Sequence, residues 1–116
     1  MTLSEAIDVV VQALRAAGAR ATSDPRNLNP PIILVLPPAI TWRLSCADLA
    51  FDLYAIAGDA GTPAAVAALE QLIGAARAAL GGACTAAGPV DISTADAGVL
   101  PAYRLQYTAR KIPLTL

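Results

Sequence analysis

Two proline pairs enclose a short apolar segment in the N-terminal half of the chain. The stretch DPRNLNPPIILVLPP, residues 24–38, places Pro30-Pro31 before and Pro37-Pro38 after the segment from Ile32 to Leu36. Each proline lacks a backbone N–H and has a fixed φ, so neither pair can lie inside a sheet. Ile32 to Leu36 is therefore predicted to form a strand with sharply defined ends. Because this strand is apolar on both sides, we expect it in the middle of a sheet.

The residues before this strand indicate a helix. Thr2 and Glu5 have the spacing of a capping box, and Gly18 is a natural stop, which predicts a helix from about Leu3 to Ala17. Apolar residues recur at helical intervals between these ends, at Ile7, Val10, Val11 and Leu14. A short strand over residues 19–22 and a loop over residues 23–31 are expected to follow.

An antiparallel hairpin is predicted after the second proline pair. Large apolar residues alternate with polar or small ones on both sides of Ser45 to Asp48, which is the expected turn. With that turn, the facing pairs are Leu44 with Leu49, Trp42 with Phe51 and Ile40 with Leu53. Arg43 and Asp52 are then expected as a diagonal pair on the opposite face, and the second strand should reach Ala57.

The second half of the chain predicts one helix and two strands. Thr62-Pro63 is a typical helix start, and Gly81-Gly82 a typical end. The expected buried stripe of this helix comprises Val66, Leu69, Ile73, Ala76 and Leu80. A strand within residues 84–93 and a turn at residues 96–98 lead to a last strand that Pro113 should end. The order α-β-β-β-β-α-β-β predicts a single α+β domain over residues 1–116, with two helices on one face of a mainly antiparallel sheet.

Composition argues against most kinds of catalytic or metal site. The chain has a net charge of −1 and no histidine, and its two cysteines, Cys46 and Cys84, are far apart in sequence and are expected to be buried free thiols. Without histidine the usual catalytic base is missing, and two isolated cysteines do not complete a structural zinc site. We therefore expect no enzyme activity, no cofactor and no metal. Asp48 and Asp52 share one strand face, a pattern that fits a solvated sheet face better than a pair of catalytic acids.

The same reasoning disfavours membranes, secretion and tight binding to nucleic acid. The apolar run from Pro63 to Leu80 is interrupted by Glu70, Gln71 and Arg77, so no spanning segment is expected. No secretory signal is recognisable, which indicates synthesis in the cytoplasm. Gripping DNA by its phosphates requires a basic patch that a net charge of −1 does not suggest. The glycine-containing segment at residues 58–61 lacks the lysine and the spacing of a phosphate-binding loop and is better explained as a turn before a helix.

Several exposed side chains are candidates for contact with partner proteins. The densest basic cluster, Arg104, Arg110 and Lys111, is either a solvated strand end or a contact with a neighbouring subunit. Arg26 in the DPRN segment either holds its own loop or binds a partner. The aromatic residues Trp42, Phe51, Tyr103 and Tyr107 are expected in the core or at a subunit interface rather than as a platform for bases.

Taken together, these segments resemble the tail terminator proteins of long-tailed phages, especially those of actinobacterial hosts. The resemblance spans nearly the whole chain, from the AxGAxA-like end of the first helix through DPRNLNPP, the proline-bracketed strand and ITWRL. It continues through LAFDLYAIAG, TPAAVAALEQLIGAARAAL and LPAYRLQYTA. No catalytic signature is among these motifs.

The resemblance implies a structural virion protein at the neck of the tail, made in the host cytoplasm. Tail terminators form a ring, usually of six subunits, on the last ring of the tail tube, where they stop its polymerisation and present a surface to the head-side connector or stopper protein. DNA then passes through the lumen without specific binding. The loop over residues 23–31, with Arg26 and Asn27, and the turn that contains Asp48 become candidate contacts.

Two other readings remain open from the sequence. One is a different neck or tail-tube component, such as a stopper or a tube-like protein. The other is a small cytosolic α+β domain that binds a ligand or acts as an enzyme, which would require a pocket with convergent polar residues.

Overall fold

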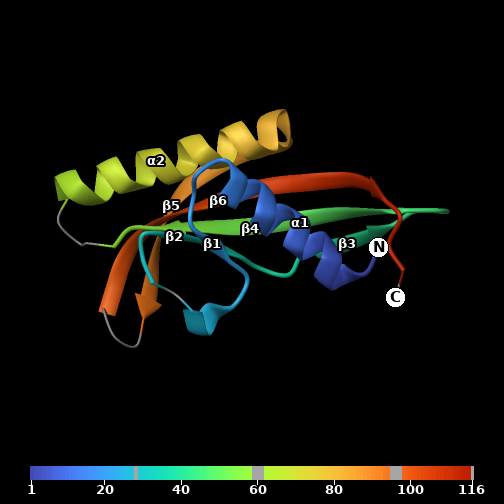
Figure 1. Cartoon of the computed structure of the whole chain (residues 1–116), viewed down its shortest axis with the longest axis horizontal. Coiled ribbons are helices and arrows are strands. Elements are labelled where there is room, and N and C mark those ends of the chain that lie inside the picture. Colours follow the sequence, from blue (N-terminus) through green and yellow to red (C-terminus); the bar gives the residue numbers. More distant parts are fainter. Residues whose placement is uncertain (28, 59–61, 95–97, 116) are drawn as a thin grey trace.

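The computed structural model describes residues 1–27, 29–58, 62–94 and 98–115, and Figure 1 shows two helices packed on one face of a six-stranded sheet. The elements confirm the predicted α+β class and the order α-β-β-β-β-α-β-β. They are α1 (Leu3–Ala16), β1 (Ala21–Thr22), β2 (Ile32–Val35), β3 (Ala39–Trp42), β4 (Ala47–Ile56), α2 (Thr62–Leu80), β5 (Cys84–Thr94) and β6 (Gly98–Ile112), with short 3-10 turns η1 (Pro25–Asn27) and η2 (Gly81–Ala83).

The sheet has the order β1-β2-β4-β6-β5, and β3 pairs with the first part of β4. All pairs are antiparallel except β1 with β2. The proline-bracketed strand β2 lies between β1 and β4, which confirms its interior position, and it ends at Val35, one residue earlier than predicted. Gly58 passes so close to the preceding proline pair that an added Cβ would lie 3.1 Å from the carbonyl oxygen of Pro30. The chain after β4 is thereby packed against the start of β2.

Helix α1 begins as the capping box predicts. The Thr2 hydroxyl accepts a hydrogen bond from the Glu5 backbone N–H at 3.2 Å, and the Glu5 carboxylate accepts one from the Thr2 backbone at 3.4 Å. The chain turns away at Gly18, whose φ of 92° is readily adopted only by glycine. The Arg15 guanidinium then donates two hydrogen bonds to the carbonyl oxygen of Ala21, at 3.1 and 2.9 Å. This contact ties α1 to β1 at the edge of the sheet.

Helix α2 packs beside α1, but its buried face differs from the predicted stripe. Leu69 and Ala76 are buried as expected, whereas Val66 is 48% exposed. Ile73 and Leu80 are only partly buried. Ala65 and Leu72 are buried in their place. The reason is the composition of α2. Its alanines are distributed around the helix, so several of its faces are apolar enough to be buried, and the packing of the sheet and α1 determines which face is buried.

By length and hydropathy alone, the stretch Pro63–Ala83 passes the test for a membrane-spanning helix, a test that the core helix of a soluble protein also passes. Only 22% of its most apolar window is buried.

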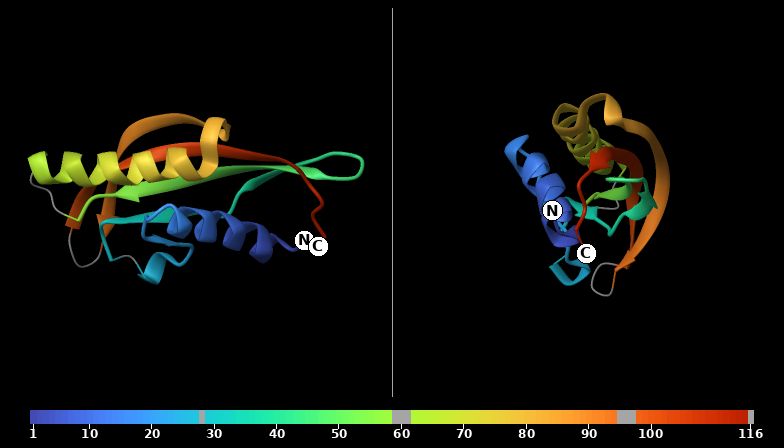
Figure 2. Two further views of the ribbon diagram at one scale, coloured as in Figure 1. Left: turned by 45° about the horizontal axis from the view of Figure 1, so that its top comes forward. Right: turned by 90° about the vertical axis from the view of Figure 1, so that its right-hand side faces the viewer.

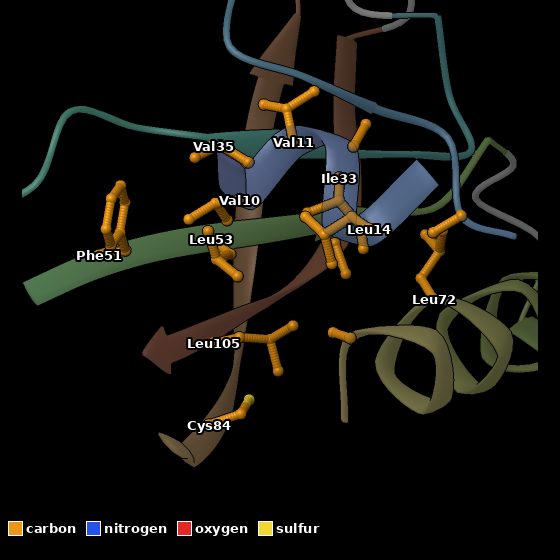
Figure 3. Packing of buried hydrophobic residues seen from close by; sticks show 14 of the residues in the cluster. Val10, Val11, Leu14, Ile33, Val35, Phe51, Leu53, Leu72, Cys84 and Leu105 are labelled. Carbon is orange, nitrogen blue, oxygen red and sulfur yellow. The ribbon is translucent and has the colours of Figure 1, made fainter. Parts of the chain in front are cut away.

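The main core lies between the helices and the sheet. Val10, Val11 and Leu14 of α1 face Ile33 and Val35 of β2 and the central strands, as Figure 3 shows. A second, smaller cluster lies on the opposite side of the sheet, here called the open face, and is formed by Leu34, Ile56, Leu100 and Ala102. The end-on view in Figure 2 shows both helices on one side of the curved sheet, which leaves the open face without a covering helix.

The predicted register of the hairpin is wrong. Trp42 pairs with Ala47 instead of Phe51, and Ile40 pairs with Leu49 instead of Leu53. The turn is shorter than expected, because the Arg43 N–H donates to the Cys46 carbonyl at 2.8 Å and encloses only residues 44–45. The expected Leu44–Leu49 pair does not form, because Leu44 lies in this turn.

The remaining elements are close to their predictions. Strand β1 covers residues 21–22 of the expected 19–22, β4 ends at Ile56, and β6 ends at Ile112 just before Pro113. The helix stop at Gly81-Gly82 is confirmed, with Gly81 at a φ of 61°. Parts of the two glycine-containing turns, residues 59–61 and 96–97, lie outside the described residues.

Candidate interaction surface

The β3–β4 hairpin projects beyond the rest of the molecule along its long axis. Figure 2 shows its turn extending past both chain ends, and the molecule measures 48 × 28 × 22 Å. Leu44 in the turn is fully exposed, and Trp42 at the end of β3 is 58% exposed. Tryptophan is enriched among the residues that contribute most to protein–protein binding, so the exposed Trp42 on this projecting hairpin marks a candidate contact site.

Asp48 fixes this hairpin to the neighbouring strand. Its carboxylate accepts hydrogen bonds from Arg43, with Nη2 to Oδ2 at 2.6 Å and Nε to Oδ2 at 3.0 Å. The backbone N–H of Lys111 donates to the other oxygen, Oδ1, at 3.1 Å. The Arg43 hydrogen bond, then the Lys111 N–H, and more weakly the charge of Arg110 hold the pKa of Asp48 below its usual value. The same contact raises the pKa of Arg43.

A bulge in β6 makes this contact possible. Ala47 pairs with Ile112 while Leu49 pairs with Ala109, so β6 contains one extra residue at this point. Lys111 within the bulge has a φ of 56°, the left-handed conformation that most side chains disfavour. The extra residue turns the Lys111 N–H toward the Asp48 side chain. Asp48 and the predicted contacts Arg110 and Lys111 therefore come together at the hairpin.

The predicted contact Arg104 lies elsewhere, on the open face. Its Nε is 3.4 Å from Asp52 Oδ1, and the two side chains are 43% and 45% exposed. This ion pair replaces the predicted diagonal between Arg43 and Asp52. Asp48 and Asp52 do share the open face, but each contacts its own arginine. An open hollow beside Arg104 is lined by residues 86–90 and Gln106.

Arg26 and Asn27 are separate again, in the turn η1. The Asp24 carboxylate accepts from the Arg26 backbone N–H at 2.9 Å and from its Nε at 3.3 Å. These two hydrogen bonds, the backbone one first, lower the pKa of Asp24. Arg26 holds its own turn, as one of the two sequence readings proposed, although its side chain remains 89% exposed. Asn27 is the last residue of η1.

The aromatic residues and cysteines divide between core and hairpin. Phe51 is buried and stacks on Tyr107, with ring centroids 5.8 Å apart. Trp42, by contrast, does not fill the core. Cys84 is a buried free thiol, as predicted, and burial raises its pKa against the opposing effect of Arg77. Cys46 is also free but only half-buried, because it lies at the hairpin turn.

Sequence reasoning missed Leu44 as a surface residue because it placed this leucine in a paired strand position, and it left Trp42 open between the core and a subunit interface. The sequence does contain one signal: a turn of Leu44 and Ser45 would leave Arg43 near Asp48, an oppositely charged partner. Within residues 1–27, 29–58, 62–94 and 98–115, no three acidic, cysteine or histidine side chains gather as metal ligands would.

The sequence matches no protein-family model, and no curated protein matches it significantly.

Proposed function

We propose that this protein is a structural component of a phage tail that forms a ring, of six subunits, on the end of the tail tube. It ends tube polymerisation there and joins the tail to the head-side connector. The sequence resemblance supports this proposal, and the observation that carries it further is the projecting hairpin with its exposed Trp42 and Leu44. A hairpin held in place by the Asp48 contacts offers a preformed attachment point, which lowers the entropic cost of assembly.

The distribution of charge is consistent with a ring through which DNA passes. Three arginines of the described chain, Arg26, Arg43 and Arg104, each contact a carboxylate. Pairing reduces the positive potential that phosphates would meet, and tight phosphate binding would oppose passage of DNA. In this proposal the protein is made in the host cytoplasm and ends in the neck of the virion.

The test is to mix the purified protein with assembled tail tubes and record its mass and symmetry by native mass spectrometry and electron microscopy. A six-fold ring, or density at one tube end only, is the expected result. Incorporation along growing tubes would instead indicate a tube-like protein. A protein that stays monomeric and does not bind tubes would contradict the proposal and favour the alternative of a small ligand-binding domain.

A further inference from the structure

We propose that the hairpin of one copy docks on the outer face of helix α1 of a second copy. The inference rests on the proposed ring function, for which it names the contact between subunits. Two surfaces carry it. The hairpin end comprises Trp42, Leu44, Arg110 and Lys111, and the α1 outer face comprises Glu5, Asp8, Val9 and Gln12.

The α1 outer face is an acidic surface with an exposed apolar residue. Asp8 and Val9 lie three and four residues after Glu5, and Gln12 lies four and three residues after them. All four side chains therefore lie on one side of the helix. All four are exposed, and Val9 is 56% exposed although it is flanked in sequence by the buried Val10. Glu5 and Asp8 give this face two negative charges.

The hairpin end has the opposite charge and a matching apolar part. Counted together with the Arg43–Asp48 ion pair at the hairpin, the hairpin end has three basic side chains and one carboxylate, which is a formal charge of +2. Because the whole chain has a net charge of −1, the rest of it carries −3. A second copy therefore offers the hairpin an attractive surface. Two helix faces combine negative charge with an exposed valine: the α1 outer face has Glu5 and Asp8 beside Val9, whereas α2 has only Glu70 near Val66, so the α1 outer face is the more complementary of the two.

The two surfaces do not cover each other within one chain. Figures 1 and 2 both show the hairpin turn extending away from α1, and Val9 and Leu44 both remain exposed. The contact must then join different copies. Because it joins two different patches head to tail, an open assembly has a free hairpin at one end and a free α1 outer face at the other, and a ring joins these two ends.

The size of the contact suits an assembly rather than an isolated pair. Three apolar side chains and a few charges bury well below the ~1,200 Å² of typical stable interfaces. A closed ring overcomes this weakness because each subunit makes the contact twice. We therefore expect weak self-association in dilute solution that salt weakens further.

The decisive experiment is a charge swap measured by sedimentation velocity over a concentration series. Asp8→Arg and Arg110→Glu should each weaken self-association roughly fivefold, and the double variant should return to within about threefold of wild type. Leu44→Ser should weaken it about tenfold or more. Val99→Ser, at an exposed position outside both surfaces, is the control for Leu44→Ser, and Glu70→Arg on α2 is the control for Asp8→Arg; both should change self-association little. Circular dichroism should show every variant folded.

A photo-crosslinking residue at position 44 provides the second measurement. Crosslinks from position 44 to α1 of another copy support the proposal. A wild-type protein that associates without such crosslinks, or variants that all associate normally, overturn it, as does a wild-type protein that stays monomeric at high concentration without crosslinks. Hairpin-dependent binding to vesicles with anionic lipids in place of self-association would also overturn it.

These outcomes separate the contact from the proposed function. Crosslinked assemblies that ignore tail tubes, or reciprocal dimers in place of rings, retain the contact and remove the terminator role. Tube capping that is unchanged in Asp8→Arg, Arg110→Glu and Leu44→Ser would retain the terminator role and remove the contact.

Discussion

At the scale of single residues, Asp48 connects strand β4 to the start of the hairpin turn and to strand β6. It contacts Arg43 across the hairpin and Lys111 from a strand 63 residues away. Because its folded pKa lies below the ordinary value of 3.8, the stabilisation is present above that pH and is lost as pH falls through the folded pKa. Asp48→Asn should therefore lower the urea midpoint at neutral pH, and the difference from wild type should shrink in acid.

The comparison that checks this prediction is Asp52→Asn. Asp52 and Arg104 form an ion pair with both side chains more than 40% exposed, and such pairs contribute about 0.2–1 kcal/mol at most. Its removal should have a smaller effect than removal of Asp48. A constant effect of Asp48→Asn between neutral and acidic pH would show that the charge of Asp48 is not what stabilises the hairpin.

Two leucines allow the same substitution at the extremes of burial. Leu53 in β4 is fully buried beneath α1, whereas Leu44 in the turn is fully exposed. Leu53→Ala should lower the free energy of unfolding by about 2–5 kcal/mol, because it removes buried methyl groups and leaves a cavity. Leu44→Ala should change it by no more than about 0.5 kcal/mol. Equilibrium denaturation of the dilute monomer measures both, and a large loss for Leu44→Ala would mean that this side chain packs within its own chain.

At the scale of elements, helix α2 contains a glycine that its structure does not require. An added Cβ at Gly74 would have no atom within 4 Å. Gly74→Ala should therefore raise the free energy of unfolding by about 0.5–1 kcal/mol, because alanine loses less backbone entropy on folding. Gly81→Ala is the contrast, since a φ of 61° strains any side chain and should make that variant less stable. Thermal unfolding of the two variants should move in opposite directions.

The elements also show which sequence signals were sufficient to predict their bounds, pairing and buried faces. Helix α1 was predicted almost to the residue because its capping box and its stop at Gly18 are local. The hairpin was recognised but paired wrongly, because its register follows the two-residue turn that the Arg43 N–H closes on the Cys46 carbonyl, whereas the sequence pattern placed the turn at Ser45 to Asp48. The buried face of α2 was predicted only in part because its alanines allow several packings.

At the scale of the whole molecule, element order was enough to predict the α+β class, since two amphipathic helices and a run of strands have few ways to bury their apolar faces. The candidate interaction surface was harder to predict from the sequence. Arg110, Lys111 and Asp48 were predicted as contacts one by one, but their meeting at the hairpin depends on a bulge in β6. Trp42 and Leu44 were expected to pair within the hairpin, and only the observed turn exposes them.

The position of β4 in the sheet predicts how the molecule opens. This strand pairs with β2 and β3 on one side and with β6 on the other, and its residues Leu49, Leu53 and Ile56 are fully buried. Strands β1 and β5 lie at the two ends of the sheet order. Amides of β4 should exchange with deuterium most slowly, at the rate of global unfolding, and those of β1 and the outer edge of β5 much faster. Hydrogen exchange of the dilute protein measures this order directly. Slower exchange in α2 than in β4 would contradict it and place the most stable unit in the helical layer.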